Sequence, residues 1–259
     1  MITFDAATTV GEIVARNPST SRVFDRAGVD FCCAGKRSLS EACLEKGIAV
    51  DAMIGQLEGE LRAVADEPAA SLADAPLAAL TRYIVERFHV PLREELPRLG
   101  RMVERVVEAH GRAHPEVIPE LARVFRIFRA ELEGHMEKEE VILFPAIEAL
   151  TRAEGGSAGG LEIQAPSSTE PVAGIASVAA LEAEHDAAGE ALRRMRELTR
   201  DFAPPAGACN TFRALYDGLA HLESEMHLHV HLENSVLFPR AQALQRELNL
   251  CASAAVSKV

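Results

Sequence analysis

The feature that most constrains how this chain can fold is a segment that occurs twice. The first copy is His135-Met-Glu-Lys-Glu-Glu-Val-Ile-Leu-Phe-Pro145, and the second is His229-Val-His-Leu-Glu-Asn-Ser-Val-Leu-Phe-Pro239. The offset between the copies is constant, since 229 − 135 and 239 − 145 both equal 94. Each copy carries a His and a Glu four positions apart, and each ends in Leu-Phe-Pro, which we interpret as a helix stop. The pattern therefore indicates an internal duplication.

One of the histidines before each copy precedes it by a similar distance. His89 lies 135 − 89 = 46 residues before His135, and His185 lies 229 − 185 = 44 residues before His229. Apolar residues at helical spacing predict four long helices, with each of these earlier histidines on the helix that precedes a copy. The predicted helices span roughly 77–110, 116–150, 175–200 and 208–247.

The spacing within each copy is suited to metal ligation. Residues four apart project from nearly the same face of a helix, so a His and a Glu at this spacing can reach one point. Packing two such hairpins about a pseudo-two-fold axis would place four imidazoles and two carboxylates inside a bundle, where helical bundles build two-metal sites. The alternative is a pair of duplicated structural helices, and the repetition of the whole pattern favours ligands. The candidate ligands are His89, His135, Glu139, His185, His229 and Glu233.

The chemistry of this donor set narrows the metal. Nitrogen and oxygen donors without a thiolate suit iron or manganese better than a closed tetrahedral zinc site. If both glutamates bridge, each metal has two His ligands and two shared oxygens, and an oxo or hydroxo bridge makes five ligands. One octahedral position then stays open for a small molecule.

The remaining histidines are interpreted differently. His227 and His231 lie two residues before and after His229 but on other sides of the helix, so we expect both to face solvent. His110 and His114 lie near the end of the first long helix, where His is favourable for the helix dipole. His110 is kept as a candidate further ligand or as a hydrogen-bond partner of a ligand.

The chain is expected to be all-α and to have two domains. Residues 66–76 contain two prolines and interrupt the helical periodicity, so we predict a linker with a boundary near residue 70. A small helical domain, 1–70, then precedes a four-helix bundle, 71–259. A flexible Gly/Ser/Pro-rich insert at 154–174 divides the bundle into two hairpins. In the small domain, Thr9-Val-Gly-Glu and Ser38-Leu-Ser-Glu both fit the capping-box pattern.

Paired cysteines stand out in the small domain, within Asp30-Phe-Cys-Cys-Ala-Gly-Lys36. Cys32 and Cys33 have Cα atoms only about 3.8 Å apart, so a disulfide between them would be strained. Lys36 and Arg37, with a helix beginning just after them, favour thiolates that act as nucleophiles or metal ligands. Two small buried hydrophobic residues are the alternative. The odd number of cysteines indicates reduced thiols, at Cys32, Cys33, Cys43, Cys209 and Cys251.

Charge and the N-terminal sequence argue against a nucleic-acid-binding, a secreted or a membrane protein. The formal net charge of −12 argues against nucleic-acid binding, which needs a basic surface. No Lys or Arg precedes Arg16 and no long apolar run is present, so neither a secretory signal nor a membrane span is predicted. We expect a cytoplasmic protein without a membrane partner.

With these motifs the chain resembles the repair-of-iron-centres di-iron family, which joins an ScdA-type N-terminal domain to a hemerythrin-like four-helix bundle. The resemblance spans nearly the whole chain. It rests on residues 30–36, on both copies of the duplicated segment, on Arg87-Phe-His89 and on Glu184-His185-Asp186. Ala34 departs from the family, which usually has Gly there, and this affects the local turn if that Gly needs a positive φ.

The resemblance implies a bacterial cytoplasmic protein with an oxo-bridged di-iron site. Such proteins are linked to recovery of iron–sulfur clusters damaged by nitric oxide or peroxide. The implied partners are damaged iron–sulfur proteins as iron acceptors and nitric oxide or O2 as a small ligand, and a homodimer is one possible assembly. The implied terminal ligands are His89, His135, His185 and His229, and the implied bridges are Glu139 and Glu233.

Three functions remain open at this point. Iron delivery to a damaged cluster predicts exchangeable iron. A nitric oxide reductase, the one enzymatic alternative, predicts conversion of nitric oxide to nitrous oxide with a reductant. A sensor or carrier of O2 or nitric oxide predicts reversible binding. Cys32 and Cys33 are the candidate catalytic residues, with a role in transferring nitric oxide or in holding iron in transit.

Overall fold

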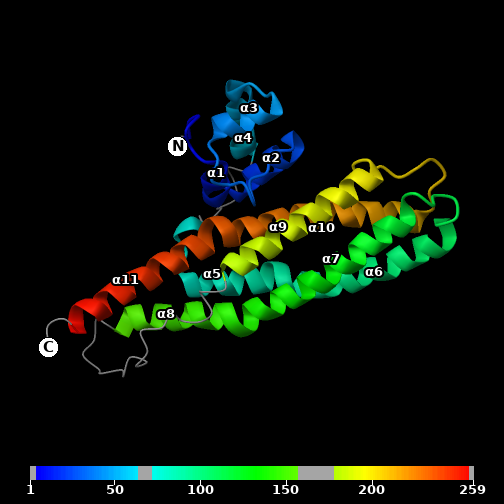
Figure 1. The fold of residues 1–259 in the computed structure, drawn as a ribbon. Helices are drawn as coiled ribbons and strands as arrows, with labels where there is room; N and C mark the ends of the chain where they lie inside the picture. The colour runs from blue at the N-terminus through cyan, green and yellow to red at the C-terminus, as the bar shows by residue number, and fades with distance from the viewer. Residues whose placement is uncertain (1–3, 64–71, 157–177, 257–259) are drawn as a thin grey trace. The chain divides into compact units, whose positions relative to one another are not determined.

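A computed structural model of the chain describes residues 4–63, 72–156 and 178–256 (Figure 1). These residues form helices and turns, with one isolated bridge between Thr9 and Ser38. The prediction of an all-α chain is confirmed. The chain divides into two compact units, one from residues 1–82, 141–179 and 228–259 and the other from residues 83–140 and 180–227.

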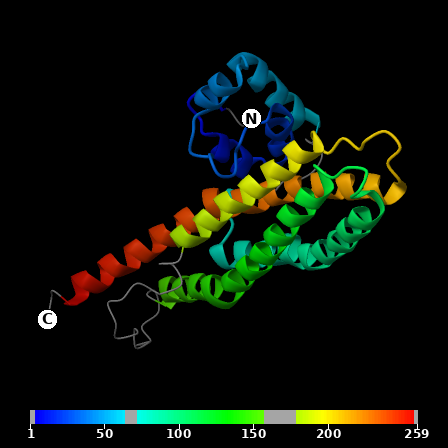
Figure 2. The same cartoon turned by 45° about the vertical axis from the view of Figure 1, so that its right-hand side comes forward.

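The second unit is a four-helix bundle. It contains η3 (Val85–His89), α6 (Val90–His110), α7 (Ile118–Lys138) and most of α9 (Val178–Thr199) and α10 (Asn210–Leu232). In both views these helices run side by side (Figures 1 and 2). Every helix turns apolar side chains inward, and burying each large one stabilises the bundle by about 1.5–3 kcal/mol. Examples of such buried side chains are Leu99, Phe125, Leu192 and Leu219.

The first unit begins with short helices that share one core. They are α1 (Val10–Arg16), η1 (Pro18–Thr20), α2 (Ser21–Ala27), α3 (Leu39–Lys46) and α4 (Val50–Ala63). Phe24, Leu39 and Leu57 are fully buried in this core. The same unit holds η2 (Leu72–Asp74), most of α5 (Leu77–Ile84) and of η4 (Glu139–Leu143), α8 (Phe144–Gly156), η6 (Glu233–Leu237) and α11 (Phe238–Val256).

The predicted capping signals locate the starts of two helices. Ser38 forms a complete capping box at α3, since its hydroxyl accepts from the Glu41 N–H and the Glu41 carboxylate accepts from the Ser38 N–H. Thr9 caps α1 through its hydroxyl, which accepts from the Glu12 N–H at 3.2 Å. Both starts are therefore confirmed.

We expect Ser38→Ala to lower the free energy of unfolding by about 1 kcal/mol, because the substitution removes the side-chain acceptor at the start of α3. Chemical denaturation of the metal-free chain measures this change. Ser19→Ala is the control, since Ser19 lies in η1 and caps no α-helix. Equal losses in the two variants would contradict the capping role.

Two sequence predictions concern segments that lie wholly or mostly outside the described residues. The domain boundary near residue 70 and most of the insert at 154–174 lie outside the described residues. The described end of the predicted linker forms η2, and the Arg240 guanidinium donates to the carbonyls of Ala73 and Ala75 at 3.0 and 2.7 Å. Among the helices that the structure describes, none is long and apolar enough to span a membrane.

Three turns in the long helices are wider than an α-helical turn. They are the π-helical segments η3, η4 and η6. The Val90 N–H donates to the Val85 carbonyl and the Phe238 N–H to the Glu233 carbonyl, each five residues back. A proline stands at the second residue after each of these turns, at Pro91, Pro145 and Pro239.

The helix stop predicted at Leu-Phe-Pro is therefore wrong. The chain continues as α8 after η4 and as α11 after η6, with the proline in the first turn of each. A proline in a regular helix lacks an N–H donor and clashes with the carbonyl four residues earlier. The π turn just before it shifts the hydrogen-bond register and makes room for the ring.

Candidate metal centre

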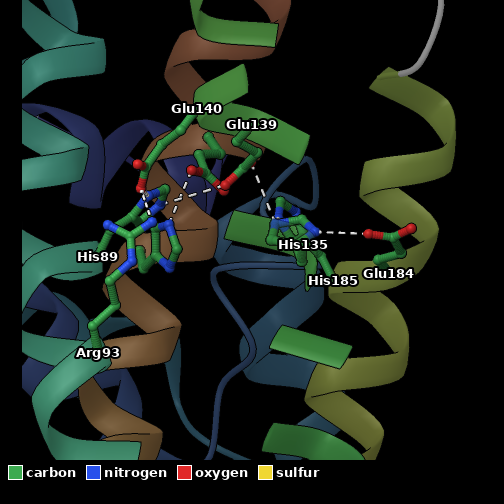
Figure 3. Close-up of polar contacts among 9 residues, drawn as sticks. His89, Arg93, His135, Glu139, Glu140, Glu184 and His185 are labelled. Carbon is green, nitrogen blue, oxygen red and sulfur yellow. Dashed lines mark hydrogen bonds and ion pairs between the residues drawn. The ribbon is translucent and has the colours of Figure 1, made fainter. Parts of the chain in front are cut away.

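Four of the six candidate ligands meet in the interior of the four-helix unit. His89 ends η3, His135 lies on α7, Glu139 begins η4 and His185 lies on α9. All four side chains are buried. Figure 3 shows Glu139 placed between His89 on one side and His135 with His185 on the other. Three helices of the bundle thus direct polar side chains into one small region.

The donor atoms in this group lie close enough together to share a cation. The Glu139 Oε1 lies 3.3 Å from the His135 Nε2, and its Oε2 lies 3.4 Å from the His89 Nε2. The Nε2 atoms of His135 and His185 are 2.9 Å apart. Neither oxygen of Glu139 has a hydrogen-bond partner among the described residues. A buried carboxylate in this state is costly, and a bound cation would offset the cost.

His89 is oriented by a carboxylate on the adjacent helix. Its Nδ1 lies 2.7 Å from the Glu140 Oε1, and Arg93 donates to the same oxygen at 2.8 Å. Burial would raise the pKa of Glu140, but the hydrogen bonds from His89 and Arg93 outweigh it and lower this pKa. Glu140 is therefore ionised and can only accept, so the His89 Nδ1 carries the proton and the Nε2 carries the lone pair.

His135 has an equivalent arrangement with a residue of α9. Its Nδ1 lies 2.9 Å from the Glu184 Oε2, and Lys138 donates to the other oxygen at 2.5 Å (Figure 3). Burial alone would raise the pKa of Glu184, and the bonds with Lys138 and His135 lower it. The His135 Nε2 is therefore also in the form that ligates metals. A carboxylate on the far nitrogen of a ligating His is the usual support of a metal site.

Sequence reasoning missed the roles of Glu140 and Glu184. Each stands directly beside a candidate ligand in the sequence, Glu140 after Glu139 and Glu184 before His185. That adjacency was the available signal. The partner of each carboxylate lies about 50 residues away, so only the packed bundle shows which imidazole it supports.

The other two candidate ligands lie in the first unit. The His229 Nε2 is 3.0 Å from the Glu233 Oε1, and both side chains are fully buried. His229 is on α10 and Glu233 begins η6, so this pair has the same setting as His135 and Glu139 in the first copy. The four-residue spacing therefore brings a His and a Glu together in both copies.

The π turns coincide with the candidate ligands. His89 is the last residue of η3, Glu139 the first of η4 and Glu233 the first of η6. Single π turns within α-helices occur frequently at functional sites, where they redirect side chains from the regular helical path. The Leu-Phe-Pro sequence, whose Leu is the last residue of η4 and of η6, was the signal for this irregularity.

The structure also bears on the predictions for two other histidines, His231 and His110. The expectation that His231 faces solvent is wrong, because His231 is buried against Phe31 and burial lowers its pKa to about 4. His110 lies at the end of α6, with its Nε2 3.2 Å from the Cys209 Sγ and its ring tilted against that of Phe212, with the centroids 5.1 Å apart. His110 is not in any group of potential ligands among the described residues.

Cys32 does not behave as predicted from its basic neighbours. Cys32 is buried, and its Sγ lies 3.7 Å from that of Cys33 and 3.3 Å from the Asp30 Oδ1. The hydrogen bond with Cys33, burial and the Asp30 charge raise the pKa of Cys32 well above its usual value. The predicted thiolate is therefore wrong for Cys32. Arg37 forms an ion pair with Glu45, so its charge is not directed at the thiols.

Buried imidazoles and a carboxylate that face one another in a four-helix bundle are typical of a helical cation-binding protein. Two family models match this chain. The "Hemerythrin HHE cation binding domain" matches residues 80–164 and 171–241, and ScdA_N, a "Domain of Unknown function (DUF542)", matches residues 6–60. The chain therefore belongs to the hemerythrin HHE family, in the group that carries an ScdA_N domain.

Curated relatives match this chain over most of their length. The chain is 38% identical over 234 residues to the iron-sulfur cluster repair protein YtfE of Pectobacterium carotovorum, and 37% identical over 234 residues to that of Yersinia pseudotuberculosis. Each match covers 90% of this chain and 95% of the relative. The resemblance to the repair-of-iron-centres family is confirmed.

Proposed function

We propose that this chain is a di-iron protein that helps to repair iron–sulfur clusters damaged by nitrosative or oxidative stress, by donating iron. The observation that carries the proposal is the buried group around Glu139, whose two oxygens face imidazole nitrogens that carboxylates hold in the ligating form. The names of the curated relatives, iron-sulfur cluster repair proteins, supply the biological setting. The proposed setting is the bacterial cytoplasm.

The proposed centre has six protein ligands. The second copy of the segment would complete it with His229 and Glu233, and the duplication supports this because it gives that pair the same local geometry as the first copy. The family match also extends across both copies. Glu139 and Glu233 would bridge the two irons, and His89, His135, His185 and His229 would be the terminal ligands.

The residues of the chain have distinct tasks in this proposal. Iron held here supplies Lewis-acid and one-electron redox chemistry. Glu140 and Glu184 keep a proton on the Nδ1 of His89 and His135 and fix the ring planes. Burial of the carboxylates and imidazoles keeps water from competing for the donor atoms.

Donation and catalysis can be separated in one anaerobic experiment. Reduced iron-loaded protein is incubated with an apo-ferredoxin in one sample, and with nitric oxide and a reductant in another. Donation predicts loss of iron from this chain together with an assembled cluster on the ferredoxin, and little nitrous oxide. Repeated turnover to nitrous oxide with all iron retained would contradict donation and favour a reductase.

A further inference from the structure

The turn that begins at Glu233 contacts the loop that carries the paired cysteines. The His231 Nδ1–H donates to the Phe31 carbonyl at 3.2 Å, and the two rings meet edge to face at 5.7 Å. The Asn234 amide donates to the Cys32 carbonyl at 3.4 Å. The residues on either side of Glu233 along the chain are thus bonded to the backbone of the cysteine loop, residues 30–36.

Ser235, the next residue of η6, packs closely against two glycines, Gly11 and Gly35. A Cβ added at Gly11 would lie 2.9 Å from the Ser235 Oγ, and one added at Gly35 would lie 3.0 Å from it. The same Cβ at Gly11 would lie 2.9 Å from the Gly35 carbonyl oxygen, which already accepts the Gly11 N–H at 2.9 Å. Only glycine at both positions lets α1, the cysteine loop and η6 approach this closely.

In the first copy of the duplicated segment, the residues equivalent to Asn234 and Ser235 make different contacts. The offset of 94 places Glu140 opposite Asn234 and Val141 opposite Ser235. Glu140 orients His89, and Val141 is 67% exposed. In the second copy an amide and a hydroxyl stand in their place and contact the N-terminal domain. The two copies have therefore diverged at the residues just after the proposed bridging glutamate.

We propose that Asn234 and Ser235 are positioning residues that couple the cysteine loop to Glu233, so that iron retention and the accessibility of Cys33 depend on each other. This inference rests on the proposed iron site. Iron that binds Glu233 would hold η6 in place, and η6 would hold the loop. Because coupling between two sites is reciprocal, a displaced loop would also weaken the hold on iron.

The test uses Gly11→Ala in the full chain, which disturbs the contact without touching a ligand. Gly55→Ala is the matched control, because a Cβ on Gly55, in α4 of the same domain, meets nothing within 4 Å. Asn234→Ala removes the amide that donates to the Cys32 carbonyl and serves if Gly11→Ala does not fold. Two rates are measured, alkylation of Cys33 by iodoacetamide with and without bound iron, and transfer of ferrous iron to a chelator.

In the wild type and in Gly55→Ala, iron should slow alkylation of Cys33 by about fivefold or more. In Gly11→Ala or Asn234→Ala this protection should shrink, and iron should leave about fivefold faster or more. Equal alkylation with and without iron in the wild type, or unchanged rates in both variants, would overturn the coupling.

Two further measurements distinguish a failure of the coupling from a failure of the proposed iron site. If the wild type binds iron but alkylation of Cys33 does not change with iron, the coupling alone is overturned. If the wild type binds no iron, the proposed function is overturned and the coupling with it. In the double variant His89→Ala/His185→Ala, iron should no longer protect Cys33. Protection that persists there would mean that iron binds at the thiols directly, and this also contradicts the coupling.

Discussion

Glu139→Leu should abolish iron binding and, at the same time, make the metal-free protein more stable. Glu139 is fully buried, contacts two imidazoles and has no hydrogen bond to either oxygen among the described residues. An apolar side chain of similar size removes that unsatisfied group, so the free energy of unfolding should rise by about 1–3 kcal/mol. Iron content after reconstitution and chemical denaturation of the metal-free chain measure the two effects.

Glu137→Leu is the matched control for this variant. Glu137 lies two residues earlier on α7 and is exposed, so its replacement should change neither iron content nor stability by a comparable amount. A Glu139→Leu variant that retains two irons would refute the bridging role. A variant that loses iron and also loses stability would show that the carboxylate has a structural role that the geometry does not reveal.

The second large effect is expected at the carboxylates that orient the histidines. Glu140→Ala and Glu184→Ala should each weaken metal binding by about 10–100-fold, because His89 or His135 would lose the acceptor that fixes its tautomer and ring plane. Competition with a chelator of known affinity measures the change. The glutamine variants, which keep an acceptor oxygen, should lose less.

Surface carboxylates on the same helices provide the controls for this series. Glu133 on α7 bonds to Arg129, and Glu190 on α9 bonds to Arg193, both at the exposed face. Replacing either with Ala should leave metal affinity within about twofold, since exposed ion pairs contribute little. If Glu140→Ala and Glu184→Ala behave like these controls, the orienting role is wrong.

Local spacing was enough to predict the main elements of this protein. The period of 3.6 residues gave four helices, and the four-residue interval brought His135 to Glu139 and His229 to Glu233 at 3.3 and 3.0 Å. The capping box at Ser38 was likewise readable, because all of its atoms belong to four consecutive residues. These pairs and this cap need only contacts within one helical turn, which the sequence spacing specifies.

Features that depend on distant contacts were not predictable in this way. His231 was expected in solvent because its own helix offers no reason for burial, and the Phe31 that covers it lies 200 residues earlier. The raised pKa of Cys32 likewise follows from its hydrogen bond with Cys33 and from burial, neither of which the basic residues nearby reveal. The π turns arise where a proline and a ligand must share one helix, a conflict that a regular helical pattern does not show.

The central claim is that one chain holds two irons, and metal analysis combined with Mössbauer spectroscopy tests it most directly. Protein purified from cells supplied with both iron and zinc should contain about two irons per chain, with spectra of a coupled pair in nitrogen and oxygen ligation. Replacing His185 or His229 with Ala should lower the iron content. A single zinc per chain without iron, or one isolated iron that survives loss of Glu139, would contradict the account.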